Sequence, residues 1–294
     1  MIDLSKKWAQ WLTLAALALT WGSSFILMKK GLLAFGPQEV AAYRLSTAFL
    51  FMAIIGHKHW KHFNAKIILP VLVVGFLGNG IPAFLFTKAQ TKLDSSYVGI
   101  LNALVPLFSL IVGILFFRLR VRWFNSIGII LGLCGAFVLM YPNLVEGTNE
   151  DWSYALYPIL ATIFYAISLN TIKRYLTHLK SITITVLAFT AVGPWALAYL
   201  IFYTDFTNQL AFEGQALTSL LMITILGVVG TALAVLIFNQ LVKQSTVIFA
   251  SSVTYFIPVT AILWGLLDGE RIGFNHLAGI STILLGVYLV NKKF

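Results

Sequence analysis

Apolar residues fill this chain in long blocks, and polar residues are concentrated in short stretches between the blocks. Each block runs for about 17 to 25 residues, enough helix to cross a hydrocarbon layer of about 30 Å. Because hydrocarbon forces backbone groups to bond within their own segment, we expect helices throughout. The predicted membrane segments are 10–34, 38–56, 67–87, 96–117, 123–141, 153–173, 181–203, 216–240, 246–267 and 273–291.

The second half of the chain repeats the pattern of the first. Residues 86–106 (FTKAQTKLDSSYVGILNALVP) align without gaps with residues 238–258 (FNQLVKQSTVIFASSVTYFIP), 152 positions later. After a one-residue deletion the match continues into the last segment of each half, where two glycines align with two glycines. A repeat in an apolar chain indicates two similar helix bundles with something placed between them.

The repeat defines the expected organisation of the chain. We predict an all-α integral membrane protein with ten transmembrane helices, in which residues 1–145 and 151–294 each form a five-helix repeat. The polar loop 143–152 is the expected boundary. Because five is an odd number, the second repeat enters the membrane from the opposite side, and the two repeats are inverted relative to one another. Two complementary halves can form a complete pathway across the membrane in one chain. We therefore expect a monomer, while a dimer stays possible.

Composition and charge support this class and set an orientation. The chain is 59% hydrophobic and 10% charged, with a mean hydropathy of +0.89, which no soluble core accommodates. If the N-terminus is cytoplasmic, 14 of the 20 Lys and Arg residues fall inside and nine of the ten acidic residues outside. We therefore predict a multi-pass protein of the cell (cytoplasmic) membrane with both termini cytoplasmic. The net charge of +10 favours contact with the lipid bilayer over nucleic acid, because no basic domain is present.

Several motifs resemble EamA-type transporters of the drug/metabolite transporter superfamily. They are Trp21–Phe25 (WGSSF), Arg44 in AAYRLSTAF, the two mid-helix prolines, and the stretch LLDGER that ends at Arg271. One departure is visible, because Arg118-Leu119-Arg120 in the first half lacks the acid that Glu270 supplies in the second. The resemblance implies ten helices, inverted repeats and a central cavity for amino acids, sugars, nucleotides or other metabolites, without naming the substrate.

Arg44 is the most informative charge inside a predicted segment. It lies about six residues, or roughly 9 Å, from the outer end of the second segment. A charge at this depth in the membrane costs free energy unless it pairs with another group, reaches the headgroups by snorkelling, or contacts water. Two interpretations are open. The side chain either snorkels to headgroups or to a neighbouring helix, or it faces a cavity and attracts a substrate carboxylate or phosphate. Lys29, Lys30 and Lys88 lie nearer the outer ends, where snorkelling is expected.

Two prolines occupy equivalent positions in the fourth and ninth segments. Pro106 and Pro258 each remove a helical hydrogen bond and kink their helix, so they are either hinges or fixed bends. Glycines near Asn79 allow close helix packing, while Asn79 itself is a candidate for a cavity. The remaining predicted site residues are aromatic or polar groups within the segments. With Arg44 and Asn79, the predicted substrate-binding residues are Trp21, Ser24, Asn102, Tyr165, Asn239 and Tyr255, and weaker candidates are Asn170, Thr231 and Ser252.

The sequence offers no catalytic constellation and no metal or cofactor site. Its ten acids all lie near segment ends or in loops, and His57, His59 and His62 lie in a basic loop without an acidic or cysteine companion. A drug/proton antiporter for organic cations typically needs an acid deep in the membrane. We therefore expect a secondary transporter, most simply an exporter, of a small-molecule substrate such as an amino acid or a related zwitterionic or anionic compound. The alternatives are a drug or organic-cation efflux carrier, a channel and an intramembrane enzyme.

Overall fold

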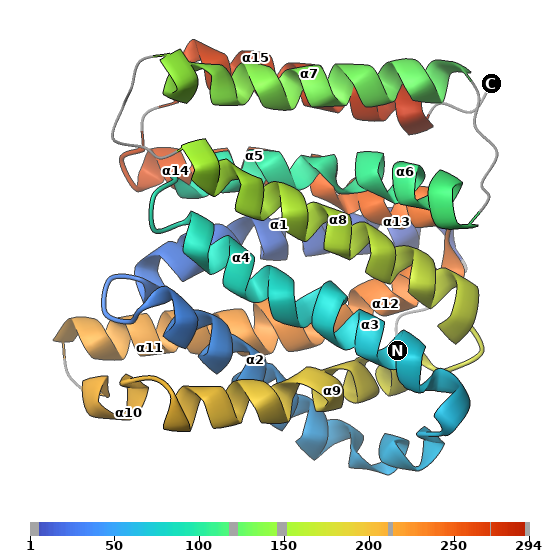
Figure 1. Cartoon of the computed structure of the whole chain (residues 1–294), viewed down its shortest axis with the longest axis vertical. Coiled ribbons are helices and arrows are strands. Elements are labelled where there is room, and N and C mark those ends of the chain that lie inside the picture. The colour runs from blue at the N-terminus through green and yellow to red at the C-terminus, as the bar shows by residue number, and fades with distance from the viewer. Residues whose placement is uncertain (1–5, 118–122, 146–151, 211–213, 271, 292–294) are drawn as a thin grey trace.

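The computed structural model describes residues 6–117, 123–145, 152–210, 214–270 and 272–291, and these are helical or looped without strands (Figure 1). The first half contains α1 (Lys7–Gly31), α2 (Pro37–Gly56), α3 (Ile68–Gly75), α4 (Ile81–Ala89), α5 (Ser95–Leu101), α6 (Val105–Phe117) and α7 (Trp123–Val145). The second contains α8 (Leu156–Thr171), α9 (Ser181–Phe202), α10 (Phe206–Gln209), α11 (Gly214–Gly227), α12 (Ala234–Gln244), α13 (Val247–Ser251), α14 (Ile257–Leu267) and α15 (Phe274–Asn291).

Short irregular turns join several of these helices into continuous runs. The 3₁₀ turns are η1 (His57–His62), η2 (Ala65–Ile67), η4 (Asn102–Leu104), η5 (Trp152–Ala155) and η8 (Ser252–Tyr255). The π turns are η3 (Phe76–Gly80), η6 (Ile172–Leu176) and η7 (Val228–Leu233). As a result, α3 continues into α4, α5 into α6, α11 into α12, and α13 into α14. Each pair crosses the bundle as one continuous, bent helical run.

Eight helices or helical runs in the described part of the chain are long and apolar enough to cross a membrane. Their outer faces carry exposed side chains such as Ile54, Phe116 and Trp195, which water would penalise and lipid accepts. The two remaining predicted segments, 123–141 and 273–291, are occupied by α7 and α15. The predicted boundary loop 143–152, Arg118 to Arg120 and Arg271 lie wholly or partly outside the described residues.

Helices that are far apart in the sequence pack in matching pairs. The helix α2 lies against α9, and α7 lies along α15 at one edge of the bundle (Figure 1). The contact of α1 with α14 is matched by that of α8 with α6, and the contacts of α1 with α11 and α12 are matched by those of α8 with α3 and α4. Each contact therefore has a counterpart made by the corresponding helices of the other half.

Two glycines show how closely this matching extends. A Cβ atom on Gly75 would lie 2.7 Å from the Ala188 carbonyl oxygen, and one on Gly227 would lie 3.1 Å from the Arg44 carbonyl oxygen. Both approaches bring a helix backbone against a neighbouring helix, which only a residue without a side chain permits at this distance. Gly75 and Gly227 are 152 positions apart, whereas Arg44 and Ala188 are 144 apart.

Candidate substrate cavity

Two π turns bend the helical runs α3–α4 and α11–α12 at equivalent points. In η3 the Asn79 amide Nδ2 donates to the carbonyl oxygen of Val74 at 3.0 Å, and in η7 the Thr231 hydroxyl donates to that of Leu226 at 2.8 Å. Each side chain thus binds a carbonyl oxygen five residues earlier, next to a turn that widens the helix. Such π turns are frequent at functional sites, because they redirect side chains without ending the helix.

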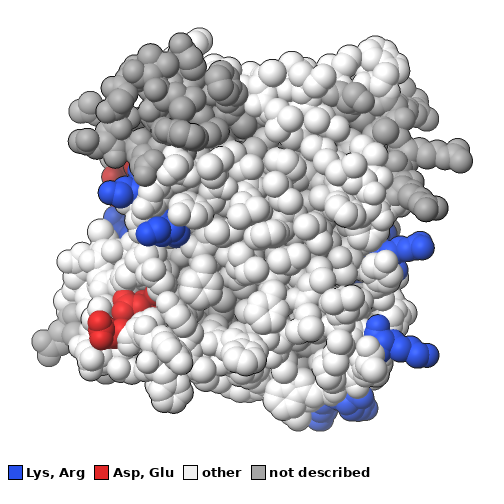
Figure 2. Space-filling model, in the orientation of Figure 1, with Lys and Arg blue, Asp and Glu red and all other residues white. Residues whose placement is uncertain are grey.

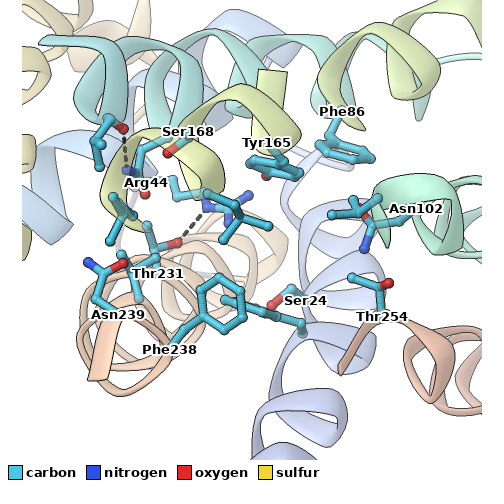
Figure 3. Close-up of a pocket in the computed structure, with 18 of the residues that line it drawn as sticks. Ser24, Arg44, Phe86, Asn102, Tyr165, Ser168, Thr231, Phe238, Asn239 and Thr254 are labelled. Carbon is cyan, nitrogen blue, oxygen red and sulfur yellow. Dashed lines mark hydrogen bonds between the residues drawn. The ribbon is translucent and has the colours of Figure 1, made fainter. Parts of the chain in front are cut away.

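A cavity of about 110 Å³ lies between the helices that carry these bends. At 10 to 15 Å³ for each water, this is room for on the order of eight waters or a small metabolite. Helices of both halves line it, with α1, α2, η3, α4 and η4 from the first half and α8, η7, α12 and η8 from the second (Figure 3). The surface is mostly apolar with a few converging polar groups, which is typical of small-molecule sites.

The lining residues pair up across the two halves. At an interval of 144 positions, Trp21 corresponds to Tyr165 and Ser24 to Ser168, and both pairs line the cavity. The two serines are equivalent in contact as well, because Ser24 approaches Gly230 just as Ser168 approaches Gly78. At an interval of 152, the lining pairs are Phe86 with Phe238, Asn79 with Thr231, and Asn102 with Thr254.

Aromatic rings form two matching walls of the cavity. Trp21 packs edge-on against Phe238 with ring centroids 4.8 Å apart, and Tyr165 stacks on Phe86 at 5.9 Å. In each contact a residue of the first helix of one half meets the third helical run of the other half. Trp21 is also fixed by a hydrogen bond from its Nε1 to the carbonyl oxygen of Gly230 at 3.0 Å. The rings offer flat apolar surfaces of defined orientation.

Arg44 breaks the symmetry of the cavity. Its guanidinium group lies at the lining, and its Nε donates to the Thr231 hydroxyl oxygen at 2.5 Å (Figure 3). The equivalent position in the other half is Ala188, which carries no charge. Among the described residues no carboxylate lies within ion-pairing distance of Arg44, and no Asp or Glu contributes to the lining. The described lining of the cavity therefore presents a cation without a carboxylate counter-ion.

The structure brings together most of the residues predicted from the sequence as a binding site. Trp21, Ser24, Arg44, Asn79, Asn102, Tyr165 and Asn239 all line the cavity, as does Thr231. Tyr255 does not, because its neighbour Thr254 takes the cavity-facing position in η8, and successive residues of a helical turn point about 100° to 120° apart. The Asn170 amide donates instead to the Ser109 and Ala166 carbonyl oxygens. The side chain of Ser252 lies outside the described part.

The two prolines follow 3₁₀ turns that face the cavity. Pro106 comes directly after η4 and the first residue of α6, and Pro258 is the second residue of α14 after η8. Asn102 and Thr254 lie in these turns, four residues before each proline. The bends therefore expose polar residues at matching points of the fourth and ninth predicted segments. Their movement as hinges stays a prediction.

A second polar cluster at one end of the bundle was not predicted from the sequence. The Glu270 side chain is 1% exposed, and its carboxylate accepts hydrogen bonds from the backbone N–H groups and hydroxyls of Ser95 and Ser96. Lys29 donates to the same carboxylate at 2.7 Å and pairs with Asp268 at 2.8 Å, and Lys30 also pairs with Asp268. These contacts, which we call the Glu270 latch, join α1, α5 and the loop after α14.

Neighbouring groups stabilise the ionised form of the Glu270 carboxyl group. Burial alone raises the pKa of its carboxyl, but hydrogen bonds from Lys29, Ser96 and Ser95 lower that pKa to about 2. Lys29 thus does more than snorkel, because it pairs with two carboxylates. In Figure 2 the visible acidic side chains lie at the left edge of the molecule together with basic ones, whereas the described charged side chains visible at the right edge are basic. The two ends of the bundle therefore differ in charge.

The comparison with known proteins decides the family. The model of the EamA-like transporter family matches residues 7–141 and again residues 152–292. The chain belongs to this family. EamA-like transporters are membrane proteins, and the eight apolar helical runs agree with a multi-pass membrane protein that contacts lipid. Family membership and the names of the relatives indicate a transporter of small molecules rather than an enzyme.

Several relatives of this EamA-like transporter match over nearly the whole chain. An uncharacterized transporter of Archaeoglobus fulgidus is 25% identical, covering 97% of this chain and 99% of the relative. The uncharacterized inner membrane transporter YedA of Escherichia coli strain K12 is 23% identical, covering 94% and 89%. The WAT1-related protein At1g25270 of Arabidopsis thaliana is 23% identical, covering 85% and 79%. A protein of known crystal structure shares the fold, with a TM-score of 0.65 and 15% identity over 97% of this chain and 98% of that one.

Proposed function

We propose that this EamA-like transporter is a secondary carrier that exports amino acids or related zwitterionic or anionic metabolites. The carrier consists of two inverted five-helix repeats, residues 1–145 and 151–294, which together give ten transmembrane helices. Matching helix contacts and paired cavity residues in the two halves support this arrangement. Because inverted repeats place their site between the halves, the cavity is where substrate binds, and rocking of the halves exposes it to each side in turn.

The observation that carries the proposal is Arg44 in the cavity without a carboxylate partner among the residues that the structure describes. A lone cation among apolar side chains is poorly solvated, so an anionic group that binds there replaces lost hydration with charge-assisted hydrogen bonds. The Nε of Arg44 is held by Thr231, which orients the guanidinium group before substrate arrives. A phosphate or carboxylate fits this group, and a cavity of about 110 Å³ favours a small metabolite such as an amino acid.

The same cavity disfavours an organic cation as substrate. Aromatic rings attract cations, but a second positive charge beside Arg44 is repelled, and the described lining offers no carboxylate to neutralise it. Exchange of a drug for a proton usually requires an acid deep in the membrane. Drug efflux is therefore the alternative that a binding experiment has to exclude.

The orientation of the carrier follows from its charges. Both termini are proposed to be cytoplasmic, which places the Glu270 latch on the outer side of the membrane. There the latch ties α1 to α5 and to the loop after α14, and its separation is needed for opening toward the outside. Pro106 and Pro258, at the matching bends, are the proposed hinges.

A thermal-shift screen of the purified full-length protein tests this function. The panel contains amino acids, sugars, nucleotides and amphipathic cations, because a ligand of the folded state raises the unfolding temperature. We expect a shift with amino acids that is lost in Arg44→Ala and retained in Arg174→Ala, a control that removes an exposed arginine that is not part of the cavity lining. A shift with organic cations alone would overturn the proposal in favour of drug efflux.

A further inference from the structure

Asn102 differs from the other asparagines in the helices around the cavity. The amides of Asn79, Asn170 and Asn239 each donate to a protein oxygen, with bonds of 3.0, 3.0 and 2.9 Å to Val74, Ser109 and Thr185. Asn102 is only 6% exposed, and in the described part of the chain its Oδ1 atom is buried without a hydrogen-bond partner, which is the case for no amide atom of the other three. Buried polar groups are nearly always bonded, so a buried amide oxygen without a protein donor calls for an explanation.

The position of Asn102 points to a donor that comes from the cavity. Asn102 lines the cavity from the turn η4. Figure 3 shows Asn102 and Thr254 together on one side and Arg44 with Thr231 on the other. The counterpart Thr254 donates its hydroxyl proton to the Ser251 carbonyl oxygen at 2.9 Å, and its oxygen keeps lone pairs that can accept. Of these two oxygens in the described part of the chain, the Asn102 amide oxygen is the one that is buried without a hydrogen-bond partner, so it is the acceptor that gains most from a donor.

We infer that Asn102 Oδ1 accepts a hydrogen bond from the amino group of the substrate whose anionic group binds Arg44. This assignment rests on the proposed function and refines it, because it makes Asn102 the residue that distinguishes an α-amino acid from a simple carboxylate. The described lining contains no carboxylate, so an ammonium group has to be recognised by neutral acceptors. The rings of Trp21 and Tyr165 then face the apolar side chain of the amino acid.

The selectivity has a physical cause. A carboxylate without an amino group displaces water from the cavity but leaves the Asn102 oxygen without a donor. A site built to bond a substrate N–H rejects an analogue that lacks it, because its own buried polar group is then unpaired. Asn102 therefore adds discrimination, while Arg44 supplies most of the attraction.

Two pairs of ligands that differ only in the amino group test the inference. The pairs are L-leucine with 4-methylpentanoate and L-phenylalanine with 3-phenylpropanoate, titrated into the purified full-length protein by calorimetry. The variants are Asn102→Leu, of similar size, and the control Ser109→Ala. Ser109 lies in α6, is fully buried, and has a hydroxyl oxygen without a partner, but it is not part of the cavity lining.

We expect the wild type to bind each amino acid at least tenfold more tightly than its partner carboxylate. In Asn102→Leu this preference disappears through weaker amino-acid binding, whereas Ser109→Ala retains it. Equal binding of both members of a pair to the wild type overturns the inference even if Asn102→Leu fails to fold, and leaves Arg44 as the anion site. A preference that persists in Asn102→Leu also overturns it. If none of the four ligands binds, the proposed amino-acid carrier itself fails, and the inference fails with it.

Discussion

Asn79 and Thr231 occupy the same position in two related helix bends, and each donates a hydrogen bond to the carbonyl oxygen of the residue five positions earlier. The two residues differ in type, but the bond is the same. Since both also line the cavity, the bends that widen the helices are built into the wall of the site. The chemistry of the cavity and the shape of its helices are therefore maintained by the same side chains.

Removing either bond should lower stability. Asn79→Leu and Thr231→Val each leave a carbonyl oxygen at the π turn without its side-chain donor, at an expected cost of about 1 to 3 kcal/mol. Thr231→Val also removes the acceptor for Arg44, so it should weaken substrate binding more than its effect on stability accounts for. The measurement is thermal unfolding in detergent with Thr218→Val, an exposed threonine, as the control. An unchanged unfolding temperature for both variants would contradict a structural role for these bonds.

The close backbone contacts predict a sensitivity to a single methyl group. Gly75→Ala puts a Cβ atom 2.7 Å from the Ala188 carbonyl oxygen, and Gly227→Ala puts one 2.9 Å from the Thr47 Cβ. Each should destabilise the protein by about 1 to 3 kcal/mol, because two packed helices have to separate. Gly273→Ala is the matched control, since the nearest atom to its Cβ is 3.9 Å away. If all three variants have the unfolding temperature of the wild type, α3 and α11 do not pack as closely against α9 and α2 as described.

The Glu270 latch predicts a dependence on pH. The pKa of Glu270 falls from an ordinary value of 4.5 to about 2 in the folded protein, so its carboxylate stabilises the fold fully above pH 4.5. That contribution declines as the pH falls from 4.5 toward 2. Glu270→Gln should lower the unfolding temperature at pH 7 and flatten its dependence on pH below 4.5. Asp205→Asn, in the loop between α9 and α10, is the control. If the unfolding temperature of Glu270→Gln depends on pH below 4.5 as steeply as that of the wild type, the latch does not stabilise the fold.

Much of the fold could be predicted because the lengths of the apolar segments and the internal repeat can be read directly from the sequence. Seven of the eight predicted binding residues line one cavity, since a polar side chain in an apolar helix is placed where it can be solvated or bonded. The exception, Tyr255, lies one position from the lining residue Thr254, a difference in helical phase that the local 3₁₀ turn decides.

Other features depend on contacts that sequence spacing does not reveal. Lys29 and Glu270 are 241 positions apart, and only the packed bundle brings the end of α1 to the loop after α14. The correspondence of Trp21 with Tyr165 was also missed, because it follows an interval of 144 rather than the 152 that aligns the later segments. Glycines near Asn79 indicated close packing, yet the π turn became apparent only from the backbone.

The central claim is that Arg44 binds the anionic group of a transported amino acid, and transport into proteoliposomes tests it most directly. Vesicles loaded with an unlabelled amino acid that shifts the unfolding temperature would be given the same compound in labelled form outside, for wild type, Arg44→Ala, Arg44→Lys and the control Arg174→Ala. We predict uptake by wild type and Arg174→Ala, at least tenfold less by Arg44→Ala, and an intermediate rate for Arg44→Lys, which keeps the charge but not the forked geometry. Wild-type rates in both Arg44 variants would contradict the account.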